Sequence, residues 1–380
     1  MKIVHLISTI NNNGGIQRIL FNYLPYIQSE TVNNSFVVHG KANSALADEY
    51  KKLGCTIYPI KPRKEARSFS DYLRCLGNVL KGLDYDILHI HLGFKSAFAL
   101  YLSKKYHPNS KVIVHIHSNM KQLSFAISFT KKILTFYIKR KADAFFACGE
   151  DSARWFYGDS FCKKNGVFIM RNAISVDKFV FSPDDRRSIR NEFSIDKSTT
   201  VIGHVGTFYK PKNHEFLVNV FYSYLKMNNN AVLMLVGGGE LENKIKKQVE
   251  ELGIQNKVLF VGVREDVFRY LSCFDFFVLP SIYEGVPVSI VEAQCSGLNC
   301  FISSNVTKEI DETGLCHFLD LKKGSFYWAK EILDFKHNED RQLVSEKMKG
   351  SKFDIYFASG ELLSKYDKIL TGGHLNGIKN

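Results

Sequence analysis

Short runs of β-branched and aromatic residues alternate with longer amphipathic stretches along almost the whole chain. Apolar runs bounded by helix-length segments are typical of parallel strands that are covered by helices on both faces. The pattern therefore predicts an α/β fold. Strands are expected at residues 3–8, 35–39, 56–60, 86–91, 112–117, 144–147, 167–170, 201–205, 232–236, 257–261, 274–279 and 300–303.

The alternation of strands and helices starts twice, which indicates two domains. Residues 172–198 interrupt it with a polar stretch, Ser-Pro-Asp-Asp-Arg-Arg at 182–187, and are predicted to be a linker. We expect two doubly wound Rossmann-like domains, residues 1–171 and 199–352, that face a central cleft. A C-terminal helix at 353–371 is expected to pack back on the first domain. Ligands of such sheets bind beyond the carboxyl ends of the strands, so the loops there are the places to look for chemistry.

Charge and composition narrow the choice of partners. The 380 residues include 51 Lys and Arg and 38 Asp and Glu, a net charge of +13, which favours phosphorylated substrates or anionic lipids. No nucleic-acid-binding module is recognisable, so no nucleic-acid partner is expected. The eight cysteines form no Cys-x-x-Cys pair and are interpreted as reduced core residues. No signal peptide or membrane-spanning run is present, and a cytoplasmic location is expected.

The strongest motif follows the strand expected at 274–279. Gly285 permits a tight turn before a helix, and the backbone amides of Gly285 and Val286 then lie at a helix N-terminus, where the dipole favours a phosphate. Glu284 and Glu292 flank this turn as hydrogen-bond acceptors. Two isolated glutamates at such places are more often a helix cap and a solvated helix residue, so their meaning depends on the neighbouring segments.

Those neighbours give the motif a specific meaning. Glu284 and Glu292 frame Gly-Val-Pro and follow Val-Leu-Pro-Ser. Upstream segments are Ile-Gly-His-Val-Gly at 202–206, Lys-Pro-Lys-Asn-His at 210–214, Leu-Val-Gly-Gly-Gly-Glu at 235–240 and Phe-Val-Gly-Val-Arg-Glu-Asp-Val at 260–267. Together they resemble the retaining glycosyltransferases of family 4, which have the two-domain GT-B fold and use these segments, in this order, as the sugar-nucleotide site.

The resemblance implies roles for individual residues. Lys212 and the helix start stabilise the leaving diphosphate, Glu284 positions the sugar, and Glu292 binds the ribose. The implied donor-binding residues are Gly206, Thr207, Gly237, Gly238, Val263, Arg264, Gly285, Val286 and Glu292. Family members usually have an arginine where this chain has Thr207, so half of the cationic clamp on the diphosphate is missing. The implied donor is a uridine or guanosine diphosphate sugar, and no cofactor is expected.

The first half resembles the same family less specifically. A loop at 11–18 joins the first strand to the first helix, and its Gly14 and Gly15 correspond to the glycine-rich loop on the acceptor side. The spacing Gly-x-Gly-x-x-Gly is absent, which disfavours a nicotinamide dinucleotide site. The flexible turn before a capped helix is an equally good interpretation of this loop from composition alone.

Two pairs of histidines end neighbouring strands. Alternation sends His115 and His117 to one face, and His117 lies nearer the carboxyl edge, so the catalytic cleft histidine of the family maps to His117. His89 and His91 form a second pair, which we interpret as hydrogen-bonded histidines beneath a loop. No carboxylate or cysteine stands at ligand spacing, so no metal site is expected.

Residues 125–146 mix aromatic and aliphatic residues with cations. This composition fits a helix on an anionic membrane surface as well as a core-packed helix with a solvated basic face. The family resemblance favours the membrane, because similar enzymes glycosylate lipid-linked acceptors. The expected protein is a retaining hexosyltransferase, peripheral on the inner face of a bacterial membrane, that adds sugar to a lipid-linked or oligosaccharide acceptor in capsule, exopolysaccharide or O-antigen synthesis.

Two alternatives remain from the sequence. A nucleotide-sugar epimerase has the same architecture but needs no acceptor, so it would change a donor sugar incubated alone. A non-catalytic protein that binds nucleic acid or anionic membrane would account for the charge of +13, and its binding to DNA would weaken with salt.

Overall fold

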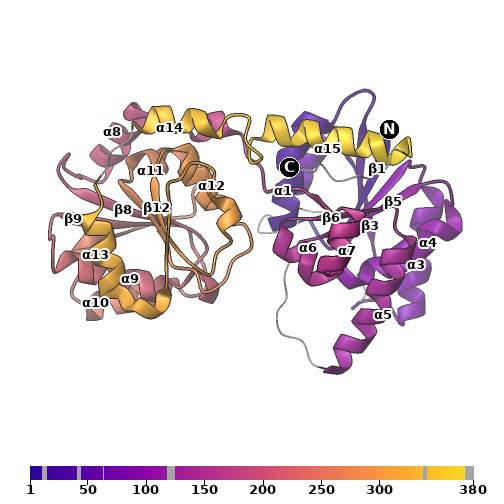
Figure 1. Ribbon diagram of the computed structural model, residues 1–380, viewed down its shortest axis with the longest axis horizontal. Coiled ribbons are helices and arrows are strands. Elements are labelled where there is room, and N and C mark those ends of the chain that lie inside the picture. Colours follow the sequence, from indigo (N-terminus) through magenta and orange to yellow (C-terminus); the bar gives the residue numbers. More distant parts are fainter. Residues whose placement is uncertain (11–14, 41–43, 63, 118–124, 337–339, 373–380) are drawn as a thin grey trace. The chain divides into compact units, whose positions relative to one another are not determined.

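A computed structural model describes residues 1–10, 15–40, 44–62, 64–117, 125–336 and 340–372 (Figure 1). The chain forms two compact units. The first comprises Met1–Ala173 with the C-terminal segment from Ile355, and the second comprises Ile174–Asp354. Each unit is built on one parallel sheet with helices on both faces, so the predicted α/β class with two Rossmann-like domains is confirmed.

The first unit has a seven-stranded sheet in the order β3-β2-β1-β4-β5-β6-β7. Its strands are β1 (Lys2–Ile7), β2 (Asn33–His39), β3 (Thr56–Ile60), β4 (Ile87–Ile90), β5 (Lys111–Ile116), β6 (Ala144–Ala147) and β7 (Phe168–Ile169). Its helices are α1 (Gly15–Ile27), α2 (Ala45–Lys52), α3 (Phe69–Gly82), α4 (Ser96–Tyr106), α5 (Phe125–Lys141), α6 (Glu150–Tyr157), α7 (Asp159–Asn165) and α15 (Ile355–Leu370). All strands expected in the first half are present, with ends that differ by a residue or two.

The second unit has a six-stranded sheet in the order β10-β9-β8-β11-β12-β13. Its strands are β8 (Thr200–Val205), β9 (Ala231–Val236), β10 (Val258–Gly262), β11 (Phe276–Leu279), β12 (Asn299–Ser303) and β13 (Cys316–Leu319). Its helices are α8 (Pro183–Glu192), α9 (His214–Leu225), α10 (Glu242–Glu251), α11 (Val267–Cys273), α12 (Val288–Cys295), α13 (Gly324–Asp334) and α14 (Arg341–Met348). Strand β13 was not expected, because it is a short edge strand whose central two residues are only partly buried.

Alternation along the strands divides each core in two. In β1, Ile3 and Ile7 pack with α1 and α15 on one face, and Val4 and Leu6 pack with the cluster on the other face. The C-terminal helix α15 lies beside α1, and its Tyr366 is fully buried there (Figure 1). The helix expected at 353–371 therefore belongs to the first unit, whereas α14 belongs to the second.

The linker expected at 172–198 needs correction, because from Ile174 onward the chain is part of the second unit. Ile174 and Ile189 lie in its core. The polar run that suggested a linker is the first turn of α8, where the Ser182 hydroxyl caps the helix by accepting from the amide of Asp185 and Pro183 opens it. An amphipathic helix begins with the same residue types that mark a loop, which explains the error.

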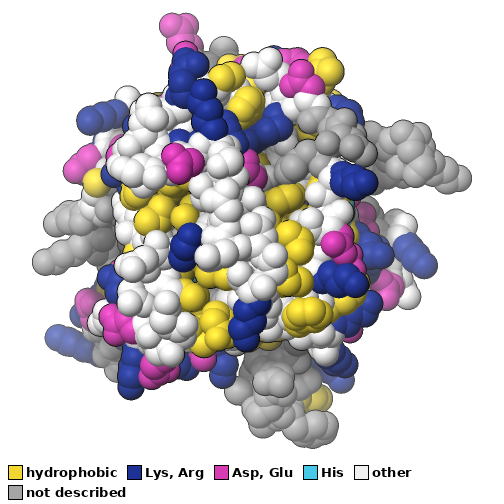
Figure 2. Space-filling model, turned by 90° about the vertical axis from the view of Figure 1, so that its left-hand side faces the viewer, with side chains coloured by type: hydrophobic (Ala, Val, Ile, Leu, Met, Phe, Trp, Pro, Cys, Tyr) yellow, Lys and Arg dark blue, Asp and Glu magenta, His cyan; other side chains and the backbone are white. Residues whose placement is uncertain are grey.

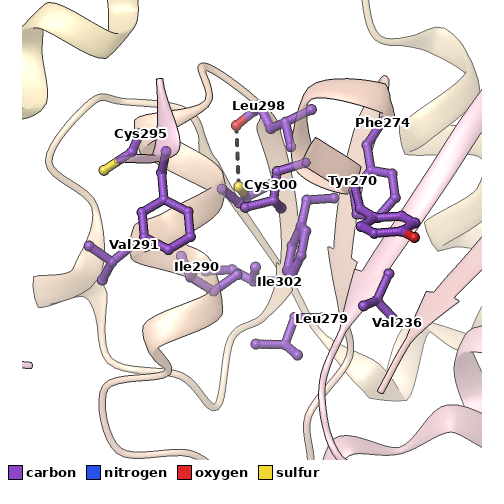
Figure 3. Packing of buried hydrophobic residues seen from close by; sticks show 14 of the residues in the cluster. Val236, Tyr270, Phe274, Leu279, Ile290, Val291, Cys295, Leu298, Cys300 and Ile302 are labelled. Atoms are coloured by element: carbon purple, nitrogen blue, oxygen red, sulfur yellow. Dashed lines mark hydrogen bonds between the residues drawn. The ribbon is translucent and has the colours of Figure 1, made fainter. Parts of the chain in front are cut away.

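Apolar packing fixes the helix α12 on the second sheet. Ile290 and Val291 of α12 lie near Ile302 of β12 and Leu279 of β11 in one buried cluster (Figure 3). In the same cluster the thiol of Cys300 donates to the carbonyl oxygen of Leu298 at 3.2 Å. The start of α12 is thereby held at the carboxyl end of β11.

The surface and the helices bear on possible partners. On the face of the second unit shown in Figure 2, Lys and Arg side chains lie dispersed among acidic and apolar ones and form no continuous basic surface. None of the helices in the described ranges combines the length and the apolar character that a membrane crossing requires.

Candidate active site

Three glycine turns meet at the carboxyl edge of the second sheet. The amide of Gly206, after β8, donates to the carbonyl of Val236 at 3.0 Å, and the amide of Gly237, after β9, donates to Gly262 at 2.8 Å. Gly237 has φ +139°, and a Cβ there would lie 2.1 Å from the carbonyl oxygen of Gly206. Only glycine fits this contact. The turns therefore pack backbone against backbone, at the edge where ligands of such sheets bind.

A buried ion pair lies beside these turns. Lys212 Nζ is 2.8 Å from Glu284 Oε1, and the two side chains are only 12% and 13% exposed. The Lys212 stem runs past Gly206, where a Cβ would come within 3.3 Å of Lys212 Cε. The Ser281 hydroxyl also donates to Glu284 Oε1, at 3.4 Å. Sequence analysis expected both residues in one site, but not that they would pair with each other.

Two hydrogen bonds fasten the loop before α12 to the turn that contains Lys212. The amide of Ile282 donates to Pro211 O at 2.8 Å, and Asn213 Nδ2 donates to Pro280 O at 3.0 Å. Asn213 has φ +59° and ψ 45°, a left-handed conformation that asparagine tolerates better than most residues. In the sequence, the feature that marks this residue is an asparagine placed directly before an amphipathic helix.

The loop that leads into α12 has an open backbone position. Gly285 is exposed, and a Cβ there would meet nothing within 4 Å, so the turn has room for a ligand. Val286 instead packs its side chain into the core cluster. Glu292 is partly buried, and burial raises the pKa of its carboxyl to about 7, while Lys178 and Lys212 act to lower it. The same Lys212 thus acts on both glutamates of the motif.

The other expected donor-binding residues also lie at this edge of the sheet. They differ in their exposure and in the contacts that they already make. A Cβ on Gly238 would come within 3.1 Å of Val263 Cγ2, so these two residues are neighbours, and Val263 is largely exposed. Thr207 is exposed directly after Gly206. Arg264 donates to both carboxylate oxygens of Asp266, at 2.9 and 3.1 Å, and is therefore already paired.

In the first unit, His117 lies in a histidine cluster. Its ring stacks on His115 with centroids 3.9 Å apart, as alternation along β5 predicted, and its Nε2 is 2.8 Å from His91 Nδ1. Burial lowers the pKa of His117 to about 3, so the ring is neutral at physiological pH and can exchange hydrogen bonds but carries no positive charge. Of the acceptor-side glycines, Gly15 is the first residue of α1, and Gly14 lies outside the described residues.

The arrangement in the second unit suits an anionic ligand with hydroxyl groups. A buried cation, an open turn before a helix and close-packed glycine backbone are the features that hold a diphosphate. The carboxylates of Glu284 and Glu292 are acceptors for sugar or ribose hydroxyls. The second unit therefore contains both the groups that can hold a diphosphate and the acceptors for hydroxyl groups.

Comparison with known families agrees with this geometry. The family model "Glycosyltransferase Family 4" matches residues 13–178, and the model "Glycosyl transferases group 1" matches residues 185–312. Together they cover both units and the segments that carry the motifs.

Full-length relatives and solved structures extend the match. EpsF of Bacillus subtilis, named as a glycosyltransferase, is 27% identical over 96% of both chains, and the capsular polysaccharide biosynthesis glycosyltransferase CapH of Staphylococcus aureus is 23% identical over 96% of this chain and 98% of its own. An Escherichia coli enzyme named as a UDP-Gal:alpha-D-GlcNAc-diphosphoundecaprenol alpha-1,3-galactosyltransferase is 29% identical over 36% of each chain. The crystal structure of HepE from Anabaena with UDP has a TM-score of 0.77 at 15% identity, covering 97% of this chain and 100% of HepE. The chain belongs to glycosyltransferase family 4, has the GT-B type of fold, and is a glycosyltransferase of bacterial surface-polysaccharide biosynthesis.

Proposed function

We propose that this glycosyltransferase moves a hexose, with retention of its anomeric configuration, from a uridine or guanosine diphosphate sugar to a lipid-linked or oligosaccharide acceptor. The products are capsule, exopolysaccharide or O-antigen chains. The observation that carries the proposal is the buried Lys212–Glu284 pair beside the glycine turns of Gly206 and Gly237. The UDP bound to HepE supports the uridine nucleotide, and the undecaprenol-linked substrate in the name of the E. coli relative supports a lipid-linked acceptor.

In the proposed reaction the bond between the sugar C1 and the diphosphate oxygen breaks while charge builds on the leaving group. Lys212 and the amide at the open turn of Gly285 stabilise that charge, and because they are held in place beforehand they need little reorganisation. The contacts of Glu284 with Lys212 and Ser281 fall on Oε1, so its Oε2 accepts from a sugar hydroxyl. Glu292 accepts from the ribose. The hydroxyl of Thr207 adds a hydrogen bond to the diphosphate where relatives carry a charge.

We assign acceptor binding to the first unit. A neutral His117 at the edge of its sheet exchanges a hydrogen bond with the incoming hydroxyl group, and the glycine loop before α1, with Gly14 and Gly15, leaves room for the acceptor. The scheme requires no cofactor, and the transfer step itself is written without a metal ion.

A nucleotide screen by thermal unfolding tests the donor site. Uridine or guanosine diphosphate at about 100 times its dissociation constant stabilises the protein by about 2.7 kcal/mol. For a unit of this size that corresponds to a rise in Tm of about 5–10 °C. The Lys212→Met variant is expected to lose this rise. No shift with any nucleoside diphosphate would contradict the proposal, and conversion of the donor sugar without acceptor would favour an epimerase instead.

We propose further that the enzyme lies on the inner face of the cell membrane through α5. Phe129, Ile133 and Phe136 are 68%, 53% and 61% exposed and follow one another at helical spacing, so they form one apolar stripe. Lys132 and Arg140 are exposed on the same helix. An apolar stripe beside cations is the pattern of a helix that lies in the interface of an anionic bilayer.

Vesicle sedimentation tests this surface. The native protein is expected to sediment with phosphatidylglycerol vesicles and to stay in the supernatant with phosphatidylcholine vesicles. Its binding to the anionic vesicles is expected to weaken at high salt. A fully buried aromatic or aliphatic side chain contributes about 1.5–3 kcal/mol. The triple change of Phe129, Ile133 and Phe136 to serine should therefore lower the partition coefficient by at least about tenfold. A matched control changes exposed apolar residues of the other unit, Phe326→Ser with Leu343→Ser. Equal losses in both variants would remove α5 from the proposal.

A further inference from the structure

Five histidines converge on one face of the first sheet. His5 lies on β1 and His89 opposite it on β4, and His91, His115 and His117 lie further toward the carboxyl edge. Their rings form one contiguous cluster, with stacked pairs whose centroids are 4.3 Å apart for His89 and His91 and 3.9 Å apart for His115 and His117. His91, His115 and His117 each offer a ring nitrogen, and these atoms lie within 4.8 Å of one another.

Several nitrogens of this cluster lack a protein partner. His115 is 1% exposed, and neither of its ring nitrogens has a hydrogen bond within the described part of the chain. The same holds for Nδ1 of His117 and Nε2 of His89. A buried polar group without a partner costs about 1–3 kcal/mol, and such groups are rare in native proteins. Each neutral ring has one nitrogen without a proton, so unpaired buried rings gathered at one place point to a ligand that accepts a lone pair.

A chain of hydrogen bonds fixes which nitrogens carry protons. Gln28 Oε1 accepts from the backbone amide of Asn34 at 2.9 Å and also from Asn34 Nδ2, so Asn34 Oδ1 must be the atom that faces His5 Nε2 at 3.1 Å. His5 Nε2 consequently carries the proton, and in this neutral ring Nδ1 is a bare acceptor. It receives its hydrogen bond from His91 Nε2, at 3.3 Å.

The same series of hydrogen bonds places the His91 proton on Nε2, so His91 Nδ1 carries a lone pair and no proton. That nitrogen faces His117 Nε2 at 2.8 Å, at the edge of the sheet where His117 is partly exposed. A ring nitrogen with a bare lone pair, whose other nitrogen is held by a hydrogen bond to a further residue, is the form in which histidine binds metals in proteins. His5 and Asn34 provide that outer support for His91.

We propose that His91, His115 and His117 form a three-histidine site for a divalent transition-metal ion of the Zn²⁺, Co²⁺ or Ni²⁺ class. Imidazole suits these ions, and three histidines with a fourth position left to solvent make a known coordination set. Two ligands each about 2.0 Å from a tetrahedral ion are ~3.3 Å apart, close to the present spacing of His91 and His117. In the bound form the ring of His117 is the tautomer with its proton on Nδ1, so that Nε2 is free to donate its lone pair to the ion.

The edge position decides between the two possible groups of three. His5, His89 and His91 also lie within 4.8 Å of one another, but all three side chains are buried. The group with His117 reaches the edge of the sheet, where the His117 side chain is partly exposed. The sequence predicted no metal site because no carboxylate or cysteine stands at ligand spacing, but a set of three imidazoles requires neither.

Cobalt spectroscopy on tag-free, chelator-treated protein tests the site. We expect one Co²⁺ per chain, with the visible ligand-field bands of a four- or five-coordinate ion and no thiolate charge-transfer band, and displacement of Co²⁺ by Zn²⁺ in calorimetry. Thiolate bands would assign the ion to the free cysteines and overturn the proposal, as would the absence of saturable binding. The readout is independent of sugar transfer, so failure here leaves the proposed function untouched.

Variants locate the ion. His115→Gln and His117→Gln are each expected to abolish the Co²⁺ bands, and Asn34→Ala, which removes only the outer support, should weaken affinity about 10- to 100-fold. His39→Gln is the matched control, because His39 lies in the same unit and bonds the Tyr72 hydroxyl instead. Since His117 is partly exposed, its variant remains folded even if His115→Gln does not. Retained binding in a folded His117→Gln protein would overturn the assignment.

Discussion

Replacing Lys212 with methionine is expected to lower kcat for sugar transfer by about 100- to 1,000-fold, the usual cost of removing one preorganised group that stabilises developing negative charge. Lys212 is the largely buried cation beside the turns of Gly206 and Gly237. The family resemblance implies that Thr207 stands where a second cation is usual. Lys212 must therefore provide a larger share of the stabilisation of the leaving diphosphate. Initial rates with saturating donor and acceptor measure the effect.

Controls separate this loss from misfolding. Lys210 lies in the same short turn but is exposed, so Lys210→Met should keep most of the activity. Because Lys212→Met leaves the Glu284 carboxylate buried without its partner, the double variant with Glu284→Gln should recover stability but not transfer. Full activity of a folded Lys212→Met protein would remove this residue from the donor site. Glu284→Gln alone should likewise abolish transfer with little loss of folding.

Elements with a continuous apolar run could be predicted from the sequence. The central strands β1, β8 and β11 are buried on both faces, so their residue types alone mark them. The edge strand β13 lacks such a run, because half of it faces partly outward. Helix α8 was misread for a related reason: its capping Ser182 and Pro183 are also the residues of a polar loop.

The sequence motifs predicted which residues belong to the candidate site, but not the contacts between residues of different loops. Spacing within one loop placed Glu284 and Gly285 together, and family resemblance placed Lys212 near them. The direct contact between Lys212 and Glu284 depends on Asn213, whose side chain fastens two loops that are far apart in the sequence. Local pattern carries no information on such a contact.

The histidine cluster shows the same limit more strongly. Pairs two residues apart on one strand, such as His115 and His117, are visible as alternation. That His5, His89 and His115 come from neighbouring strands depends on the order β1-β4-β5 in the sheet. That order follows from the topology of the whole unit, and a single strand does not reveal it.

Replacing Asp275 with asparagine is expected to lower the free energy of unfolding of the second unit by about 3 kcal/mol or somewhat more, because it removes the shared partner of two arginines in a mostly buried ion-pair cluster. Asp275 Oδ1 accepts from Arg186 at 2.6 Å, and Oδ2 accepts from Arg190 and from the amide of Val201, at 2.8 and 2.7 Å. It also opposes the charge of Arg341, whose pKa burial lowers to about 9. Without the carboxylate these guanidinium groups repel one another beneath the surface.

For a unit of this size the loss corresponds to a fall in Tm of roughly 6–20 °C, which differential scanning calorimetry resolves. Asp184→Asn is the matched control, because Asp184 also pairs with an arginine, Arg187, but the two side chains are 85% and 69% exposed. An exposed pair contributes at most about 1 kcal/mol, so that variant should unfold within a few degrees of the native protein. Similar shifts in the two variants would mean that Asp275 acts as an ordinary surface charge, and that solvent screens the charges of the arginines around it.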